Sequence, residues 1–135
     1  MNVHVLETDG WSLLLPPEWW AERDEDTVVI GDRDGVGCIE VSELRPEAGP
    51  VDDASLAALA AAIGGEGRWK RTMVAGVPGL YAEGVDGDAA LREWCLGRGG
   101  IALYITYSCD GANRGMDDAA VDEILATLAL DPDLS

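Results

Sequence analysis

The middle of the chain carries the pattern that most restricts its fold. Between residues 68 and 108, four strand-like segments follow one another, joined by short connections that contain glycine. Connections of this kind join neighbouring antiparallel strands. The segments are 68–74, 79–85, 89–96 and 100–108. In the last one, apolar residues alternate with others, and we expect one buried face made by Ile101, Leu103, Ile105 and Tyr107.

Three shorter segments near the N-terminus also have strand character. Residues 11–15 begin with an alternating pattern, and Pro16-Pro17 ends the segment. Residues 28–30 and 38–44 flank the turn sequence 32–35, which predicts a hairpin. Its second strand places Ile39 and Val41 on a dry face and Glu40 and Ser42 on a polar face.

Two segments have the spacing of amphipathic helices. Asp52 or Asp53 is a suitable first cap, and Gly64-Gly65 a suitable end. Asp117 and Asp118 begin the second helix. Apolar residues recur at i, i+3, i+4 and i+7 in each helix, at Leu56, Leu59, Ala60 and Ile63 and at Val121, Ile124, Leu125 and Leu128.

These segments together predict an α+β fold. Each helix has a single apolar stripe, which needs a sheet face to cover it. The 135 residues fit one domain, and no linker divides them. We therefore expect one domain over residues 1–135, an antiparallel sheet of about six to seven strands flanked by two helices.

A strong negative charge narrows the choice of partners. The chain has 26 Asp and Glu against 9 Lys and Arg, a formal charge of −17. Nucleic acids and anionic membranes need clustered cations, so we expect neither as a partner. The charge suits a basic protein partner, which it would steer electrostatically. An acidic proteome background explains it equally well and implies no partner.

The ends of the chain and its cysteines bear on the compartment. The first ten residues lack the basic and apolar regions of a secretory signal, and no apolar run approaches the ~20 residues of a membrane span. Cys38, Cys95 and Cys109 form no CxxC pair, which argues against a disulfide framework or a thiolate metal site. We therefore expect the three cysteines to be ordinary small buried residues, and we expect the protein to be cytoplasmic.

Three stretches resemble the PsbP/DcrB-like superfamily. Residues 11–19, WSLLLPPEW, are similar to its opening strand, proline and tryptophan, and 74–79, VAGVPG, to a hairpin of the family. The segments 104–108 and 124–130 resemble its aromatic strand and final helix. The superfamily includes the yeast Ran-binding Mog proteins and bacterial secretion adaptors. The resemblance implies a binding protein and supplies no catalytic residues.

No catalytic, metal or cofactor site is predicted. His4 is the single histidine, so a triad would have to use it, and we expect a solvated or strand-edge residue instead. The sequence 32–35, DRDG, has Val36 where a calcium loop needs a third ligand, which favours a turn. Some of the acids will lie close together, but the sequence does not single out a catalytic pair.

The predicted binding surface combines an aromatic pair with an acidic run. Consecutive residues of an extended segment face opposite ways, so burial of Trp19 would leave Trp20 partly exposed as an anchor. The favoured reading is that both rings cover the end of the core at a tight turn, and an exposed Trp20 anchor is the alternative. The candidate protein-binding residues are Trp19, Trp20, Glu22, Asp24, Glu25 and Asp26.

A second aromatic residue lies among cations. Trp69 is flanked by Arg68, Lys70 and Arg71, an arrangement that could stack on a nucleobase. Within so negative a chain, we expect these cations to pair with neighbouring carboxylates instead.

The function expected from these observations is non-enzymatic protein binding. One form is an immunity or adaptor protein of bacterial type that masks a basic toxin or secreted effector. Another form is an adaptor that holds an apolar client segment on the sheet. The alternatives are an enzyme that uses surface carboxylates and an acidic domain without a charge-steered partner.

Overall fold

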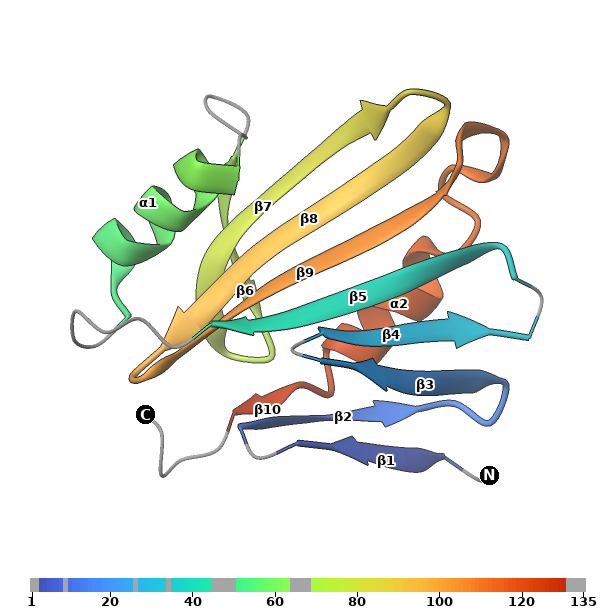
Figure 1. The fold of residues 1–135 in the computed structure, drawn as a ribbon, viewed down its shortest axis with the longest axis horizontal. Helices are drawn as coiled ribbons and strands as arrows, with labels where there is room; N and C mark the ends of the chain where they lie inside the picture. The colour runs from blue at the N-terminus through green and yellow to red at the C-terminus, as the bar shows by residue number, and fades with distance from the viewer. Residues whose placement is uncertain are drawn as a thin grey trace.

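The computed structural model describes residues 3–8, 10–25, 27–33, 35–44, 51–63 and 69–130. Figure 1 shows strands that form a large twisted sheet, with one helix in front of it and the other behind. The elements are β1 (His4–Glu7), β2 (Trp11–Leu15), β3 (Trp19–Asp24), β4 (Thr27–Asp32), β5 (Gly37–Leu44), α1 (Asp53–Ile63), β6 (Lys70–Val74), β7 (Val77–Asp86), β8 (Ala89–Arg98), β9 (Ile101–Asp110), the 3-10 helix Gly111–Asn113, α2 (Asp118–Leu125) and β10 (Ala129–Leu130).

The strands form two antiparallel sheets. The larger has seven strands in the order β3-β4-β5-β9-β8-β7-β6, and the smaller has the order β1-β2-β10. The α+β class and the antiparallel meander β6-β7-β8-β9 confirm the sequence prediction. The hairpin of β4 and β5 is also present, with Ile39 and Val41 at 1% exposure or less and Glu40 exposed.

The smaller sheet is where the structure departs from the prediction. The segment 11–15 lies in this second sheet, as β2, and not in the main one. The strands β1, β3 and β10 were not predicted. β1 and β10 are too short to show a period, and β3 shows no apolar alternation because a single residue of it, Trp19, is buried.

One turn of the meander begins earlier than expected. The connection between β6 and β7 is Ala75-Gly76, with φ of 53° and 80°. Two consecutive residues of positive φ form the primed turn that matches the twist of a hairpin. Val77 and Pro78 therefore belong to β7 and not to the connection.

One face of the seven-stranded sheet, called the inner face here, carries the main core. The predicted buried face of β9 is confirmed, with Ile101, Leu103, Ile105 and Tyr107 at most 2% exposed. The helix α2 and the small sheet cover this face and belong to the same apolar cluster. The stripe of α2 is buried as predicted, although Leu128 lies three residues beyond the end of the helix.

The helix α1 covers part of the opposite, outer face. Leu56 and Ala60 are buried in a second cluster with Cys95 and Ala102 of the sheet. The Asp52 carboxylate accepts the backbone N–H of Ser55 at 2.8 Å, so Asp52 is the N-cap of the helix. The bonds from Ser55 hold the pKa of Asp52 below its usual value. The predicted stop, Gly64-Gly65, lies outside the described residues.

The helices are short relative to a bilayer. Among the described residues, none has the length and apolar character needed for a membrane span.

Candidate functional site

The predicted binding residues divide between the two faces of β3. Trp19 points into the core and is 6% exposed. Trp20, Glu22 and Asp24 alternate with it and therefore share the outer face, where all three are exposed. Glu25 follows in the turn with a φ of 53°, and Asp26 lies outside the described residues.

Trp20 is held in a defined position on this face. It is paired across the strands with Gly31 of β4, and its indole N–H donates to the backbone oxygen of Asp32 at 3.3 Å. A methyl group added at Gly31 would meet three consecutive ring atoms at 2.6, 3.0 and 3.3 Å. Because both neighbours of the closest ring atom also lie within 3.3 Å, the ring faces the glycine and does not meet it by its edge. The other face of the ring points to solvent, and Trp20 is 44% exposed.

A row of carboxylates crosses the outer face beside Trp20. Cross-strand pairing aligns Glu22 of β3 and Glu40 of β5, with Val29 between them, and continues through Thr106 to Glu93 of β8. Two strand spacings put the backbones of Glu22 and Glu40 about 10 Å apart. Glu93 is only 2% exposed and accepts a hydrogen bond from the Tyr104 hydroxyl at 3.0 Å.

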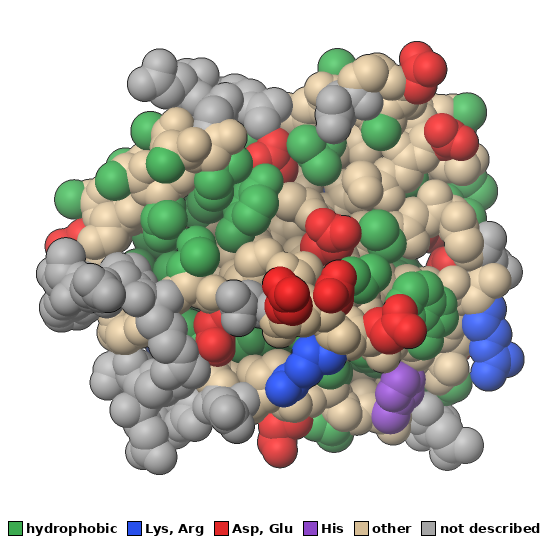
Figure 2. Space-filling view, in the orientation of Figure 1, with side chains coloured by type: hydrophobic (Ala, Val, Ile, Leu, Met, Phe, Trp, Pro, Cys, Tyr) green, Lys and Arg blue, Asp and Glu red, His purple; other side chains and the backbone are tan. Residues whose placement is uncertain are grey.

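The cross-strand rows that carry these acids contain no described cation, although exposed Arg23 lies between Glu22 and Asp24 in β3 and alternates with them. From β3 to β8, three consecutive cross-strand rows of the outer face hold no lysine or arginine among the described residues. The first row is Trp20, Gly31, Cys38, Ser108 and Leu91, and the second is Glu22, Val29, Glu40, Thr106 and Glu93. The third row is Asp24, Thr27, Ser42, Tyr104 and Cys95. Figure 2 shows acidic side chains gathered near the centre of this face, over β3 to β5. We call these rows the acidic face.

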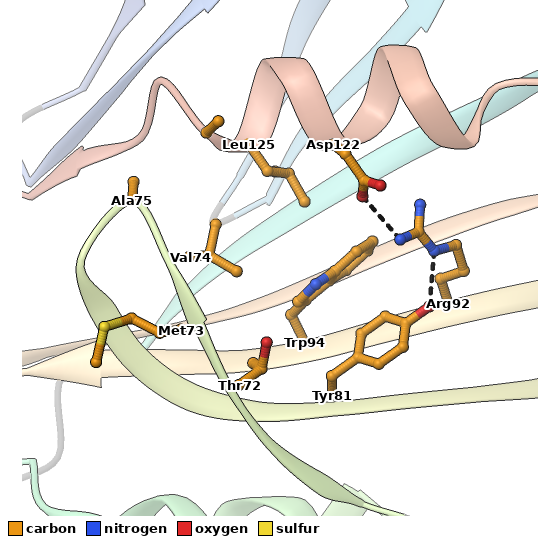
Figure 3. A pocket seen from close by; sticks show the side chains of 10 residues that line it. Thr72, Met73, Val74, Ala75, Tyr81, Arg92, Trp94, Asp122 and Leu125 are labelled. Atoms are coloured by element: carbon orange, nitrogen blue, oxygen red, sulfur yellow. Dashed lines mark hydrogen bonds and ion pairs between the residues drawn. The ribbon is translucent and has the colours of Figure 1, made fainter.

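A separate pocket lies on the inner face, between α2 and the strands β6, β7 and β8. It has a volume of about 310 Å³. Its apolar wall includes Val74, Trp94 and Leu125, while Arg92, Tyr81 and Asp122 form its polar end, as Figure 3 shows.

Arg92 is fully engaged within this pocket. Its guanidinium carbon lies 4.7 Å from the ring centre of Trp94 and 5.4 Å from that of Tyr81. Its nitrogens donate to the Tyr81 hydroxyl at 2.8 Å, to Asp122 at 2.8 Å and to Asp118 at 3.5 Å. Burial alone would lower the pKa of Arg92, but these bonds raise it. Arg92 therefore acts as a permanent cation that ties α2 to the sheet.

The single histidine and the three cysteines lie on four different strands, β1, β5, β8 and β9. His4 lies on β1, and its Nε2 is 2.8 Å from the backbone oxygen of Trp19. Cys95 and Cys109 are buried and Cys38 is half-buried; all three are free thiols. Burial raises the pKa of Cys95 to about 12, so its thiolate is disfavoured. No cluster of three potential metal ligands occurs among the described residues.

Two further predictions concern individual motifs. The turn after β4 forms as expected, since the Asp32 carboxylate accepts the Gly35 N–H at 2.9 Å. Near Trp69, Arg71 forms an ion pair with Asp53 of α1 at 3.2 Å. This pair agrees with the expectation that the cations around Trp69 pair with neighbouring carboxylates. Arg68 lies outside the described residues.

Comparison with known proteins defines the fold. No protein-family model matches the chain, and no curated protein matches it. The cyanobacterial PsbP (CyanoP) of Synechocystis sp. PCC 6803 matches with a TM-score of 0.64 at 11% identity, over 96% of this chain and 92% of that one. LpqN, involved in cell envelope biogenesis of Mycobacterium tuberculosis, matches with a TM-score of 0.62 at 12% identity, over 97% and 91%.

A longer protein contains the same fold. A structure from Bacteroides thetaiotaomicron VPI-5482 matches with a TM-score of 0.69 at 17% identity, over 90% of this chain but 45% of that one. The chain thus spans less than half the length of that protein. These matches show that the chain has an α+β fold similar to that of CyanoP and LpqN, so the expected resemblance is supported in the fold alone.

The sequence did not indicate which distant residues join the candidate site. Glu40 was placed on a polar face, but its alignment with Glu22 and Glu93 depends on the register of five strands. The cluster of Arg92, Tyr81 and Trp94 was also missed. The i, i+2 spacing of Arg92 and Trp94 is its one visible sign, and Tyr81 joins them through the pairing of β7 with β8.

Proposed function

We propose that this protein is a non-enzymatic binding module that docks a basic protein partner on its acidic face. The observation that carries the proposal is the run of three cross-strand rows that hold no described cation, two of which carry the exposed carboxylates Glu22, Glu40 and Asp24. The partner's cations would meet Glu22, Asp24 and Glu40 there, beside the exposed Trp20. Carboxylates gathered on one face attract a basic protein in a defined orientation, which an even distribution does not.

The more specific form of the proposal is an immunity or adaptor protein of the cytoplasm that masks a basic toxin or secreted effector. A large charge of one sign on a small domain supports it, because electrostatic steering gives rapid association with a toxic partner. The match of the fold to CyanoP and LpqN is compatible with a binding role, but it supports the fold alone.

A capture experiment with two matched double variants tests the proposal. Glu22→Lys with Glu40→Lys changes the acidic face. Asp88→Lys with Glu123→Lys changes two exposed acids elsewhere and shifts the charge of −17 by the same four units. Immobilised wild type and variants are exposed to lysate from the native cells at about 0.1 M and 0.5 M salt, since screening removes steering between exposed charges.

We expect the wild type and the Asp88/Glu123 variant to retain the same basic proteins at low salt and to release them at high salt. The Glu22/Glu40 variant should not retain them. If both variants retain the same proteins with the same salt dependence, the acidic face is not the docking surface.

A further inference from the structure

The outer ring face of Trp20 is an open aromatic surface within an acidic setting. In the described part of the chain, no aromatic ring or cation stacks on it, since the ring and cation contacts involve Tyr81, Trp94 and Arg92. An exposed tryptophan is often mobile, but this one has two restraints. Its inner face rests on Gly31, and its N–H is bonded to the backbone oxygen of Asp32.

The glycine at position 31 makes this arrangement possible. A Cβ there would lie 2.6 Å from the ring, closer than such contacts allow, so any larger residue would displace the indole. The ring therefore lies flat on the strand in the free protein, and a ligand that stacks on it meets a surface already in place. Such preorganisation reduces the entropy that binding costs.

The charges around the ring favour a cation. Glu22 is on the same side of β3 two residues further along, a spacing of roughly 6.6–6.8 Å along a strand. Arg33 follows in the row on the other side of the ring, where it is exposed; its backbone N–H donates to the backbone oxygen of Glu18 at 3.0 Å. An indole face beside a carboxylate attracts a cation through the ring quadrupole and through the charge.

We propose that Trp20 is the platform for an arginine side chain of the partner, with the guanidinium stacked on the outer ring face and bonded to the Glu22 carboxylate. This inference rests on the proposed function and names the residue type that the acidic face selects. Arginine fits better than lysine because its planar guanidinium stacks on aromatic rings, is weakly hydrated and can form two parallel bonds to a carboxylate.

Three peptides of equal length test the inference: repeats of Gly-Arg, of Gly-Lys and of Gly-citrulline. Citrulline keeps the planar shape without the charge. Each peptide is titrated into the wild type, Trp20→Leu and Val85→Ser, and thermal melts check that the variants fold. Val85 is a matched control because it is 68% exposed and lies on another strand.

The wild type should bind the arginine peptide roughly two- to five-fold more tightly than the lysine peptide, and the citrulline peptide far more weakly. Trp20→Leu should lose the arginine preference, and Val85→Ser should keep it. Gly31→Ala should lose the preference while Trp20 is retained, with a shifted indole N–H resonance in NMR spectra.

Equal affinity of the wild type for the arginine and lysine peptides would overturn the inference, as would an arginine preference that persists in Trp20→Leu. The proposed function fails separately. If both basic peptides bind in a salt-dependent manner and lose affinity with Glu22→Lys/Glu40→Lys, the acidic face stands and only the role of Trp20 falls. If neither basic peptide binds, both proposals fall.

Discussion

Arg92 of β8 donates a hydrogen bond to Asp122 of α2 at 2.8 Å and so joins the sheet to the helix that covers it. Only 14% of the Arg92 side chain is exposed, against 60% for Asp122. The two partners are therefore not equivalent: removal of Arg92 also empties the space beside Trp94 and takes the donor from the Tyr81 hydroxyl.

Replacement of Arg92 should destabilise the protein more than replacement of its partner. We expect Arg92→Met to lower the free energy of unfolding by roughly 1.5–3 kcal/mol, the range for hydrogen bonds to charged groups. Asp122→Asn should cost less than about 1 kcal/mol because solvent screens the exposed carboxylate. Urea unfolding measures both, with exposed Arg114→Met as the control. If Arg92→Met and Arg114→Met lowered the free energy of unfolding equally, the contacts of Arg92 with Asp122 and Tyr81 would contribute nothing to stability.

The apolar stripe of α2 gives a second prediction. Ile124 and Leu125 are 1% and 2% exposed within the main core. Truncation of either to Ala should lower the free energy of unfolding by about 2–5 kcal/mol, because a cavity adds to the lost burial. Glu123 directly precedes these two residues but is exposed, so Glu123→Ala should change the free energy of unfolding little. Similar effects of all three substitutions would contradict the packing.

Most of the fold could be predicted from the sequence because local patterns were clear. The alternation in β9 and the stripes of both helices report burial directly, and glycine turns mark the antiparallel meander. The small sheet left no such sign. Its strand β2 looks like any half-buried strand, and its assignment to a second sheet depends on pairing with β1 and β10, which are four and two residues long.

The candidate site could be predicted only in part. With Trp19 at 6% and Trp20 at 44% exposure, the structure corrects the favoured reading that both rings cover the core and agrees with the alternative from strand geometry, in which the two rings face opposite ways. The contact of Trp20 with Gly31 and the alignment of Glu22 with Glu40 both need the register of β3, β4 and β5. A shift of one residue would send each of these side chains to the other face. A single sequence does not fix that register.

The cysteines should differ in reactivity. Burial shields the sulfur atoms of Cys95 and Cys109 from a reagent, and it raises the pKa of Cys95 to about 12, so Cys95 also remains a thiol at pH 8. Half-buried Cys38 should react first. A disulfide reagent should therefore label one thiol rapidly in the native protein and all three in denaturant. Rapid labelling of Cys95 in the native state, detected by peptide mapping, would be inconsistent with this core.

The raised pKa of Tyr107 should make the folded protein less stable at high pH. Burial raises its pKa, and so does its hydrogen bond to the Asp117 carboxylate at 2.8 Å. Above about pH 10 the unfolded chain releases this proton while the folded chain retains it. The free energy of unfolding should then fall with rising pH until the folded pKa is reached, by up to about 1.4 kcal/mol per pH unit for this group.

Comparison with Tyr107→Phe isolates the effect of Tyr107. The raised pKa of Cys95 also lowers stability at high pH, but it does so equally in the wild type and in the variant. The variant should show a shallower fall between pH 10 and pH 11 in urea unfolding. Parallel curves for the two proteins would mean that Tyr107 titrates alike in the folded and unfolded states.

The most direct test of the central claim is the salt dependence of binding to a basic peptide, measured by calorimetry for the wild type and the two double variants of equal charge. We expect Glu22→Lys/Glu40→Lys to lose most of its affinity at low salt, with a shallower dependence of log Kd on log salt, because the contacts of the acidic face are gone. Asp88→Lys/Glu123→Lys should stay close to the wild type in both quantities. If the two variants lose affinity equally, the net charge of the chain attracts the peptide, and the acidic face is not a binding surface.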